Sequence, residues 1–231
     1  MNNTLLSADF APLPNLAEPR WWTGTPALPP KLFTIDGDEF RVNGAPLEPS
    51  KELAERMQKT FNDVGLVHVI NTGLDKLQSM RLIATQVIKT QRDYEGGANP
   101  RKSLEANVYE VGAPLEAWLH YHHEMAYIGS STTMVGFLCH KMPSEGGYTF
   151  VSDSVQATNA ILATPFGQKL KDLGICYHRN LTDRREFVGV PEVGVYNHWQ
   201  QSMMTEDPDE AIAEARKRGL DAEWGDNGLL K

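Results

Sequence analysis

The sequence predicts an α+β fold in which a double-stranded β-helix (jelly roll) is flanked by helices. Apolar residues before residue 90 recur every three or four positions, as in amphipathic helices. The centre, residues 107–154, consists instead of short aromatic and β-branched segments divided by Gly and Pro, which is typical of a sandwich or barrel. Helical spacing returns after this region. Helices beside a separate run of strands favour the α+β class.

The first elements follow from local signals. Residues 1–30 are rich in proline and carry Trp21 and Trp22, which predicts an irregular arm laid over the core. The segments KLFTI and EFRV flank Asp36-Gly37-Asp38, and this pattern predicts a β-hairpin.

Two helices are expected next, with a short strand, GLVHVI at residues 65–70, between them. Ser50 is of a type that caps helix N-termini, so the first helix should start directly after it. The apolar positions of the two helices are Leu53, Met57 and Phe61, then Leu77, Met80, Ala84, Val87 and Ile88.

The last third of the chain predicts a helix over residues 154–173, strands near 175–179 and 188–196, and a final well-marked helix. The apolar positions of the helix over 154–173 are Val155, Ala157, Ile161, Leu162, Phe166 and Leu170. In the final helix Asp207 is the expected N-cap, Pro208 and Glu210 fill the first turn, and Gly219 ends it. Residues 221–231 then predict a strand or turn.

Composition restricts the function. The 231 residues, 41% hydrophobic and 23% charged, fit one globular domain. The net charge of -8 argues against binding to nucleic acid or anionic membranes, and no stretch approaches the roughly 20 apolar residues of a membrane span. The N-terminus lacks the pattern of a secretory signal. We therefore expect a cytoplasmic protein that binds neither nucleic acid nor membranes, and a homo-oligomer is compatible with these features.

Two cysteines, Cys139 and Cys176, lie far apart in the apolar contexts GFLCH and GICYH. We expect them to be buried free thiols, as suits a reducing cytoplasm.

The segment LHYHHEMAYIGS, residues 119–130, contains several potential metal ligands. On an extended strand, alternate residues share a face, so His120, His122 and Glu124 would lie on one side and His123 on the other. A His-x-carboxylate pair supplies two neighbouring ligands to an octahedral ion. With one further His it forms the facial triad of non-haem Fe(II) oxygenases.

Other interpretations remain open at this point. With 7 His and 30 acidic residues in the chain, an H-x-E pattern arises easily by chance, so the segment fits a polar patch on an ordinary strand. A cluster of three histidines could also make a zinc site, although zinc usually takes its ligands in other spacings. A cupin-like metalloenzyme is a further alternative; it would use His120, His122 and Glu124 with a different third ligand, such as His140 or His198.

The order and spacing of four segments help to decide between these alternatives. The segments are YEGGANPRKSLEANVYEV, WLHYHHEMAYIGS, GFLCHKMPSEGGYTFVSDS and NHWQQSMMTEDPDEAIAEARKRGLDAEWGDN. From about Phe61 to the end, the chain resembles the taurine dioxygenase/TfdA family in its clavaminate-synthase-like branch. The resemblance implies one dioxygenase domain over residues 1–231, with His122 and Glu124 as metal ligands. The family's GG-x-T turn falls on Gly146 to Thr149, and the Thr149 hydroxyl would hydrogen-bond the distal carboxylate of 2-oxoglutarate.

The resemblance also implies the reaction. Fe(II), 2-oxoglutarate and O₂ would together hydroxylate or desaturate a small organic acid, amine or amino-acid-like substrate. Relatives that halogenate carry a small residue where this chain has Glu124, so halogenation is not expected. The alternative is a non-catalytic jelly-roll remnant that binds a partner or ligand without turnover.

Two functional residues of the family have no counterpart in the chain. Relatives take a third metal ligand, a His, and a 2-oxoglutarate-binding Arg from strands beyond the turn represented here by Trp224. The other histidines, His68, His140, His178 and His198, do not fall at that position. For His198 a capping or surface role is the stronger expectation. We therefore expect a jelly roll that is incomplete at the C-terminus and belongs to a longer protein.

Overall fold

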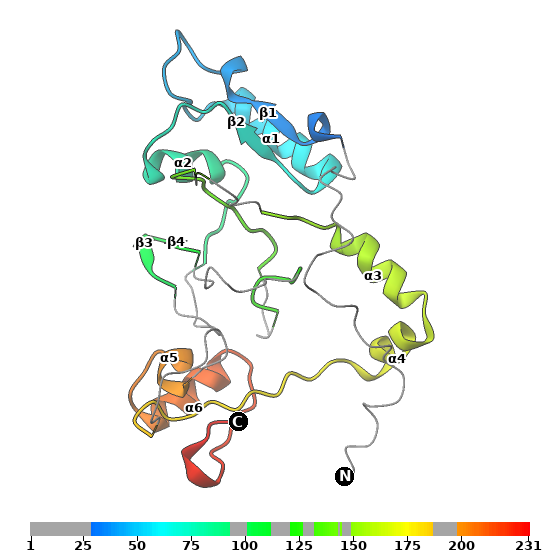
Figure 1. Ribbon diagram of the computed structural model, residues 1–231, viewed down its shortest axis with the longest axis vertical. Coiled ribbons are helices and arrows are strands. Elements are labelled where there is room, and N and C mark those ends of the chain that lie inside the picture. Colours follow the sequence, from blue (N-terminus) through cyan, green and yellow to red (C-terminus); the bar gives the residue numbers. More distant parts are fainter. Residues whose placement is uncertain are drawn as a thin grey trace.

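The computed structural model of the chain describes residues 29–92, 101–111, 121–126, 132–142, 144, 149–186 and 198–231. Figure 1 shows helices and short strands joined by long irregular segments. The helices are α1 (Lys51–Val64), α2 (Leu77–Ala84), α3 (Ser154–Leu162), α4 (Pro165–Leu173), α5 (Trp199–Met203) and α6 (Pro208–Lys217), with 3-10 turns η1 (Pro30–Leu32), η2 (Gly37–Glu39) and η3 (Asp226–Gly228). The strands are β1 (Thr34–Asp36), β2 (His68–Ile70), β3 (Ser103–Glu105) and β4 (Val108–Tyr109). Trp21, Trp22 and the strand expected at 188–196 lie outside the described residues.

The hairpin expected around Asp36 is wrong. β1 pairs in parallel with β2, and Ile35 lies opposite Val69. The Asp36 carboxylate accepts a hydrogen bond from the backbone N–H of Asp38 at 3.1 Å, which closes the turn η2 instead of reversing the chain into a second strand. Gly37 is required there, because a Cβ would lie 2.7 Å from the carbonyl oxygen of Ile70.

The predicted helix after Ser50 is confirmed. The Ser50 hydroxyl accepts a hydrogen bond from the backbone N–H of Leu53 at 3.2 Å, and Gly65 ends α1 with φ 79°. The second predicted helix is α2, which ends at Ala84, earlier than the apolar spacing indicated. The first hydrophobic core packs these helices against β1, through Ile35, Leu47, Leu53, Met57, Ile83 and Val87.

The described part of the centre contains much less strand than expected. β3 and β4 form an antiparallel hairpin whose turn includes Asn107 with φ 61°. Residues 121–126 and 132–142 form no strand, so the extended strand predicted through His122 and Glu124 is wrong over 121–126. The described strands make two two-stranded sheets and no closed barrel. The jelly roll therefore stays a prediction.

The helix predicted over residues 154–173 is two helices. Thr164 interrupts it, because its hydroxyl accepts a hydrogen bond from the N–H of Gly167 at 3.0 Å and Pro165 can begin a helix but not continue one. Two of the apolar residues that mark this region are largely exposed, since Val155 is 67% and Phe166 56% exposed.

The final helix is confirmed as α6. The Asp207 carboxylate accepts hydrogen bonds from the N–H groups of Asp209 at 2.8 Å and Glu210 at 3.3 Å, and Gly219 follows the helix with φ 73°. Leu230 forms antiparallel bridges with Leu181 and Trp224, which confirms the turn expected in residues 221–231. The second hydrophobic core consists of Leu181, Trp199, Met203, Ala211, Ala215 and Leu230. In Figure 1 this core lies at the orange and red end, opposite α1 and β1.

Two further observations concern the cysteines and the character of the helices. Cys139 and Cys176 are free, as predicted, but both are exposed. The expected burial is wrong because both lie in irregular segments and neither cysteine belongs to a hydrophobic core. Among the described residues, no helix has the length and apolar character needed to cross a membrane.

Candidate functional site

His122 and Glu124 lie next to each other, although no strand brings them together. The His122 Nε2 atom is 3.8 Å from Glu124 Oε2. Glu124 begins a turn in which Met125 has φ 56° and a buried side chain. The Glu124 side chain is 21% exposed and that of His122 56%, so the imidazole is accessible while the carboxylate is largely covered.

The donor types of this pair fit a shared metal ion. Imidazole nitrogen and carboxylate oxygen bind divalent transition metals at about 2.1 Å, so two neighbouring octahedral ligand atoms lie about 3.0 Å apart and opposite ones about 4.2 Å. The distance of 3.8 Å between Nε2 and Oε2 is longer than the first value and shorter than the second. A side-chain movement of less than about 1 Å would give the neighbouring arrangement of a facial triad.

Arg101 is a third member of the site, and no sequence pattern singled it out. Its Nη2 atom donates a hydrogen bond to Glu124 Oε1 at 2.5 Å, from a position two residues before β3. The backbone carbonyl of Glu124 also accepts from the Thr132 hydroxyl at 3.5 Å. The two carboxylate oxygens thus have separate neighbours, Oε1 beside the Arg101 guanidinium and Oε2 beside the His122 imidazole.

No third metal ligand joins this pair in the described part of the chain, where no three His, Cys, Asp or Glu side chains are grouped to hold an ion. His120 lies outside the described residues. His123, like His68 and His178, is exposed. The His140 Nε2 atom lies 3.1 Å from the carbonyl oxygen of Asp75.

His198 caps a helix, which confirms the capping role expected for it. Its Nδ1 atom accepts a hydrogen bond from the N–H of Gln201 at 3.1 Å at the start of α5. Burial, and then the charge of Arg184, lower the pKa of His198 below its ordinary value, which favours the neutral imidazole that the cap requires.

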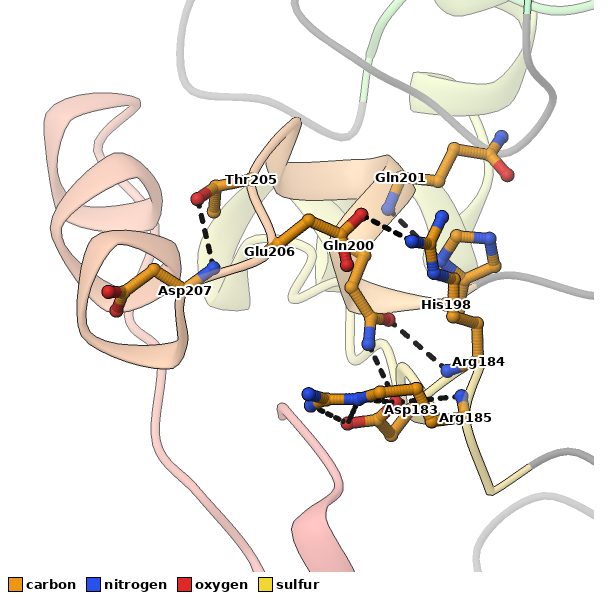
Figure 2. Close-up of polar contacts among 9 residues, drawn as sticks. All are labelled: Asp183, Arg184, Arg185, His198, Gln200, Gln201, Thr205, Glu206 and Asp207. Carbon is orange, nitrogen blue, oxygen red and sulfur yellow. Dashed lines mark hydrogen bonds and ion pairs between the residues drawn. The ribbon is translucent and has the colours of Figure 1, made fainter.

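The polar groups around His198 form a network that joins the residues after Leu181 to α5 (Figure 2). The Asp183 carboxylate accepts from the Arg185 guanidinium, and Asp183 Oδ1 accepts from Gln200 Nε2 at 2.6 Å. The Gln200 Oε1 atom in turn accepts from the N–H of Arg184 at 3.2 Å. The hydrogen bond from Arg185 is the main reason that the pKa of Asp183 lies well below its ordinary range. These contacts give the network an architectural role.

Thr149 is exposed and belongs to no helix or strand. No hydrogen bond between described residues joins it to His122 or Glu124. Gly146, Gly147 and Tyr148 lie outside the described residues, so the GG-x-T turn and the cosubstrate role of Thr149 stay predictions.

Comparison with known proteins gives one distant similarity. No family model matches the chain. A clavaminate synthase-like protein of Arabidopsis thaliana is 28% identical over 141 residues. The match covers 60% of this chain and 42% of the plant protein, so it spans less than half of that protein's length. The chain is thus a distant relative of a clavaminate synthase-like protein, and its place in the taurine dioxygenase/TfdA branch stays a prediction.

Proposed function

We propose that the chain is, or is part of, an Fe(II)/2-oxoglutarate-dependent dioxygenase that hydroxylates or desaturates a small organic acid, amine or amino-acid-like substrate. The observation that carries this proposal is the 3.8 Å separation of His122 Nε2 and Glu124 Oε2. The similarity to a clavaminate synthase-like protein supports an oxygenase. Non-haem Fe(II) oxygenases hold their metal through two His and one carboxylate and keep coordination positions open.

Each residue has a defined part in this proposal. His122 and Glu124 hold the metal through Nε2 and Oε2, because imidazole nitrogen and carboxylate oxygen are the ligand types of non-haem Fe(II) sites. Thr149 donates a hydrogen bond to the distal carboxylate of 2-oxoglutarate. Fe(II), when bound with 2-oxoglutarate, supplies the activation of O₂ for oxidation of a C–H bond.

The charges near the pair favour a dianionic cosubstrate. The Arg101 guanidinium neutralises Glu124, to which it is hydrogen-bonded. A divalent metal therefore adds two uncompensated positive charges, which the dianion 2-oxoglutarate would cancel. A local charge near zero limits the cost of enclosing the reacting groups away from water.

The test is an anaerobic titration of the 231-residue chain with Fe(II) and 2-oxoglutarate. Chelation of the metal by the keto acid should produce a weak visible charge-transfer absorption. His122→Ala and Glu124→Ala should abolish it. His123→Ala is the matched control, because it removes a neighbouring exposed imidazole outside the pair. If both ligand variants keep the wild-type absorption, the proposal is wrong. It is also wrong if neither this chain nor a chain extended at its C-terminus gives the absorption.

A second candidate is a protein that binds a ligand or partner without turnover. The observation that favours it is the ion pair between Arg101 and Glu124, which gives Glu124 a structural role without any metal. The two candidates differ under air. An oxygenase consumes 2-oxoglutarate in a manner that depends on His122, whereas a non-catalytic protein leaves the 2-oxoglutarate concentration unchanged.

A further inference from the structure

The two oxygens of Glu124 face different partners. Oε1 accepts a hydrogen bond from Arg101 at 2.5 Å, and Oε2 lies 3.8 Å from His122 Nε2. A carboxylate has two equivalent oxygens, either or both of which can bind a metal. The contact with Arg101 makes these two oxygens different, and it orients the carboxylate plane about its last torsion angle, which is otherwise soft.

We propose that Arg101 is a positioning residue that makes Glu124 a one-oxygen ligand, with Oε2 as the metal-binding atom. This inference rests on the proposed function and extends it to a residue outside the ligand set. Hydrogen bonds from neighbouring groups orient metal-binding carboxylates and tune their affinity. Arginine suits this task, because its guanidinium stays charged and donates in a fixed geometry.

A one-oxygen ligand leaves more of the metal available. An octahedral ion held by three single protein atoms keeps three positions, enough for a two-oxygen keto acid and for O₂. A carboxylate that bound through both oxygens would take one of these positions. By holding Oε1, Arg101 keeps that position open.

Arg101 need not leave for the metal to bind. The guanidinium contacts Oε1, whereas the atom that faces His122 is Oε2. The side chain of Arg101 is 35% exposed and that of Glu124 21%, so the contact is partly screened by water but not fully solvated. The structure thus favours an orienting role over a competing one, and the two roles predict opposite changes in affinity.

The experiment measures Co²⁺ binding to the full 231-residue chain by calorimetry and by visible absorption. Arg101→Ala should weaken binding about tenfold, as loss of a group that orients a ligand usually does. It should also change the shape of the Co²⁺ absorption bands, because Glu124 can then bind through both oxygens. If Arg101→Ala does not fold, Arg101→Met keeps the bulk without the donor and carries the same expectation.

Lys102→Ala is the matched control. It removes one positive charge from the neighbouring residue, which pairs with Glu110 at 4.0 Å and not with Glu124. It should leave the affinity and the spectrum unchanged. The positioning role would be overturned if Arg101→Ala bound Co²⁺ as tightly as the wild type or more tightly. It would also be overturned if Lys102→Ala lost as much Co²⁺ affinity as Arg101→Ala.

Failure of the proposed function gives a different result. If His122→Ala binds Co²⁺ as tightly as the wild type, or if neither this chain nor a chain extended at its C-terminus binds Co²⁺, the metal site itself is refuted and the role of Arg101 falls with it. If binding depends on His122 and Glu124 but not on Arg101, only the positioning role is wrong.

Discussion

Replacement of Asp183 by alanine should destabilise the C-terminal unit built on the second core. The Asp183 side chain is only 11% exposed, and it accepts hydrogen bonds from Gln200 and Arg185. Gln200 is 3% exposed, so without Asp183 its amide nitrogen would lose its acceptor in a place that water does not reach. A buried polar group left without a partner costs about 1–3 kcal/mol. We expect the free energy of unfolding of this unit to fall by about that amount.

The assay is urea unfolding at neutral pH followed by tryptophan fluorescence. Trp199 is buried in the second core and packs edge-on against Trp224, with ring centroids 5.4 Å apart, so these two of the five tryptophans in the chain should report on this unit. Arg185→Ala is the matched control. It removes the charged partner but leaves the contact between Asp183 and Gln200. Arg185 is 60% exposed, so water can replace its hydrogen bonds to Asp183, and we expect a smaller loss. The unfolding midpoints are compared and not the emission intensities, because the Arg185 guanidinium lies 5.7 Å from the centre of the Trp199 ring. Equal losses from both substitutions would refute the reasoning, because the ion pair and not the buried amide would then be decisive.

Two further predictions concern helix caps. The pKa of His198 in the folded state lies below the ordinary value of 6.5, so the unfolded chain binds the proton first as pH falls. The free energy of unfolding should therefore decrease as pH falls below about 6.5. The decrease ends once the pH is below the folded-state pKa. His198→Asn keeps a capping acceptor but does not titrate, so it should flatten this part of the pH profile, and an unchanged profile would exclude His198 as the cause. Ser50→Ala should lower the free energy of unfolding by about 1 kcal/mol, because the N–H of Leu53 loses its acceptor at the start of α1. Arg56→Ala, an exposed change within α1, is its control in denaturant unfolding, and a loss as large as that of Ser50→Ala would contradict the capping role.

Local signals predicted the helices well and the strand pairing poorly. Ser50 and Asp207 cap their helices through atoms two or three residues away, so the information lies within one turn of sequence. The pairing of β1 with β2 joins residues more than 30 positions apart, and the hairpin signal around Asp36 could not indicate it. The Thr164-Pro165 pair was a local signal for a new helix, but the apolar periodicity across it outweighed that signal in the prediction.

In the candidate site, too, local sequence signals predicted the near contact and missed the distant one. Residues separated by one position can place side-chain ends close together on a strand or in a turn, so the H-x-E spacing brought His122 and Glu124 to 3.8 Å although the predicted strand was wrong. The contact of Arg101 with Glu124 spans 23 positions and depends on how residues 101–111 fold against the turn, which no local pattern specifies. A third metal ligand would also come from a distant part of a chain. Hence the sequence can predict a pair of ligands from spacing alone, while the groups that orient the pair and complete its coordination follow only from long-range packing.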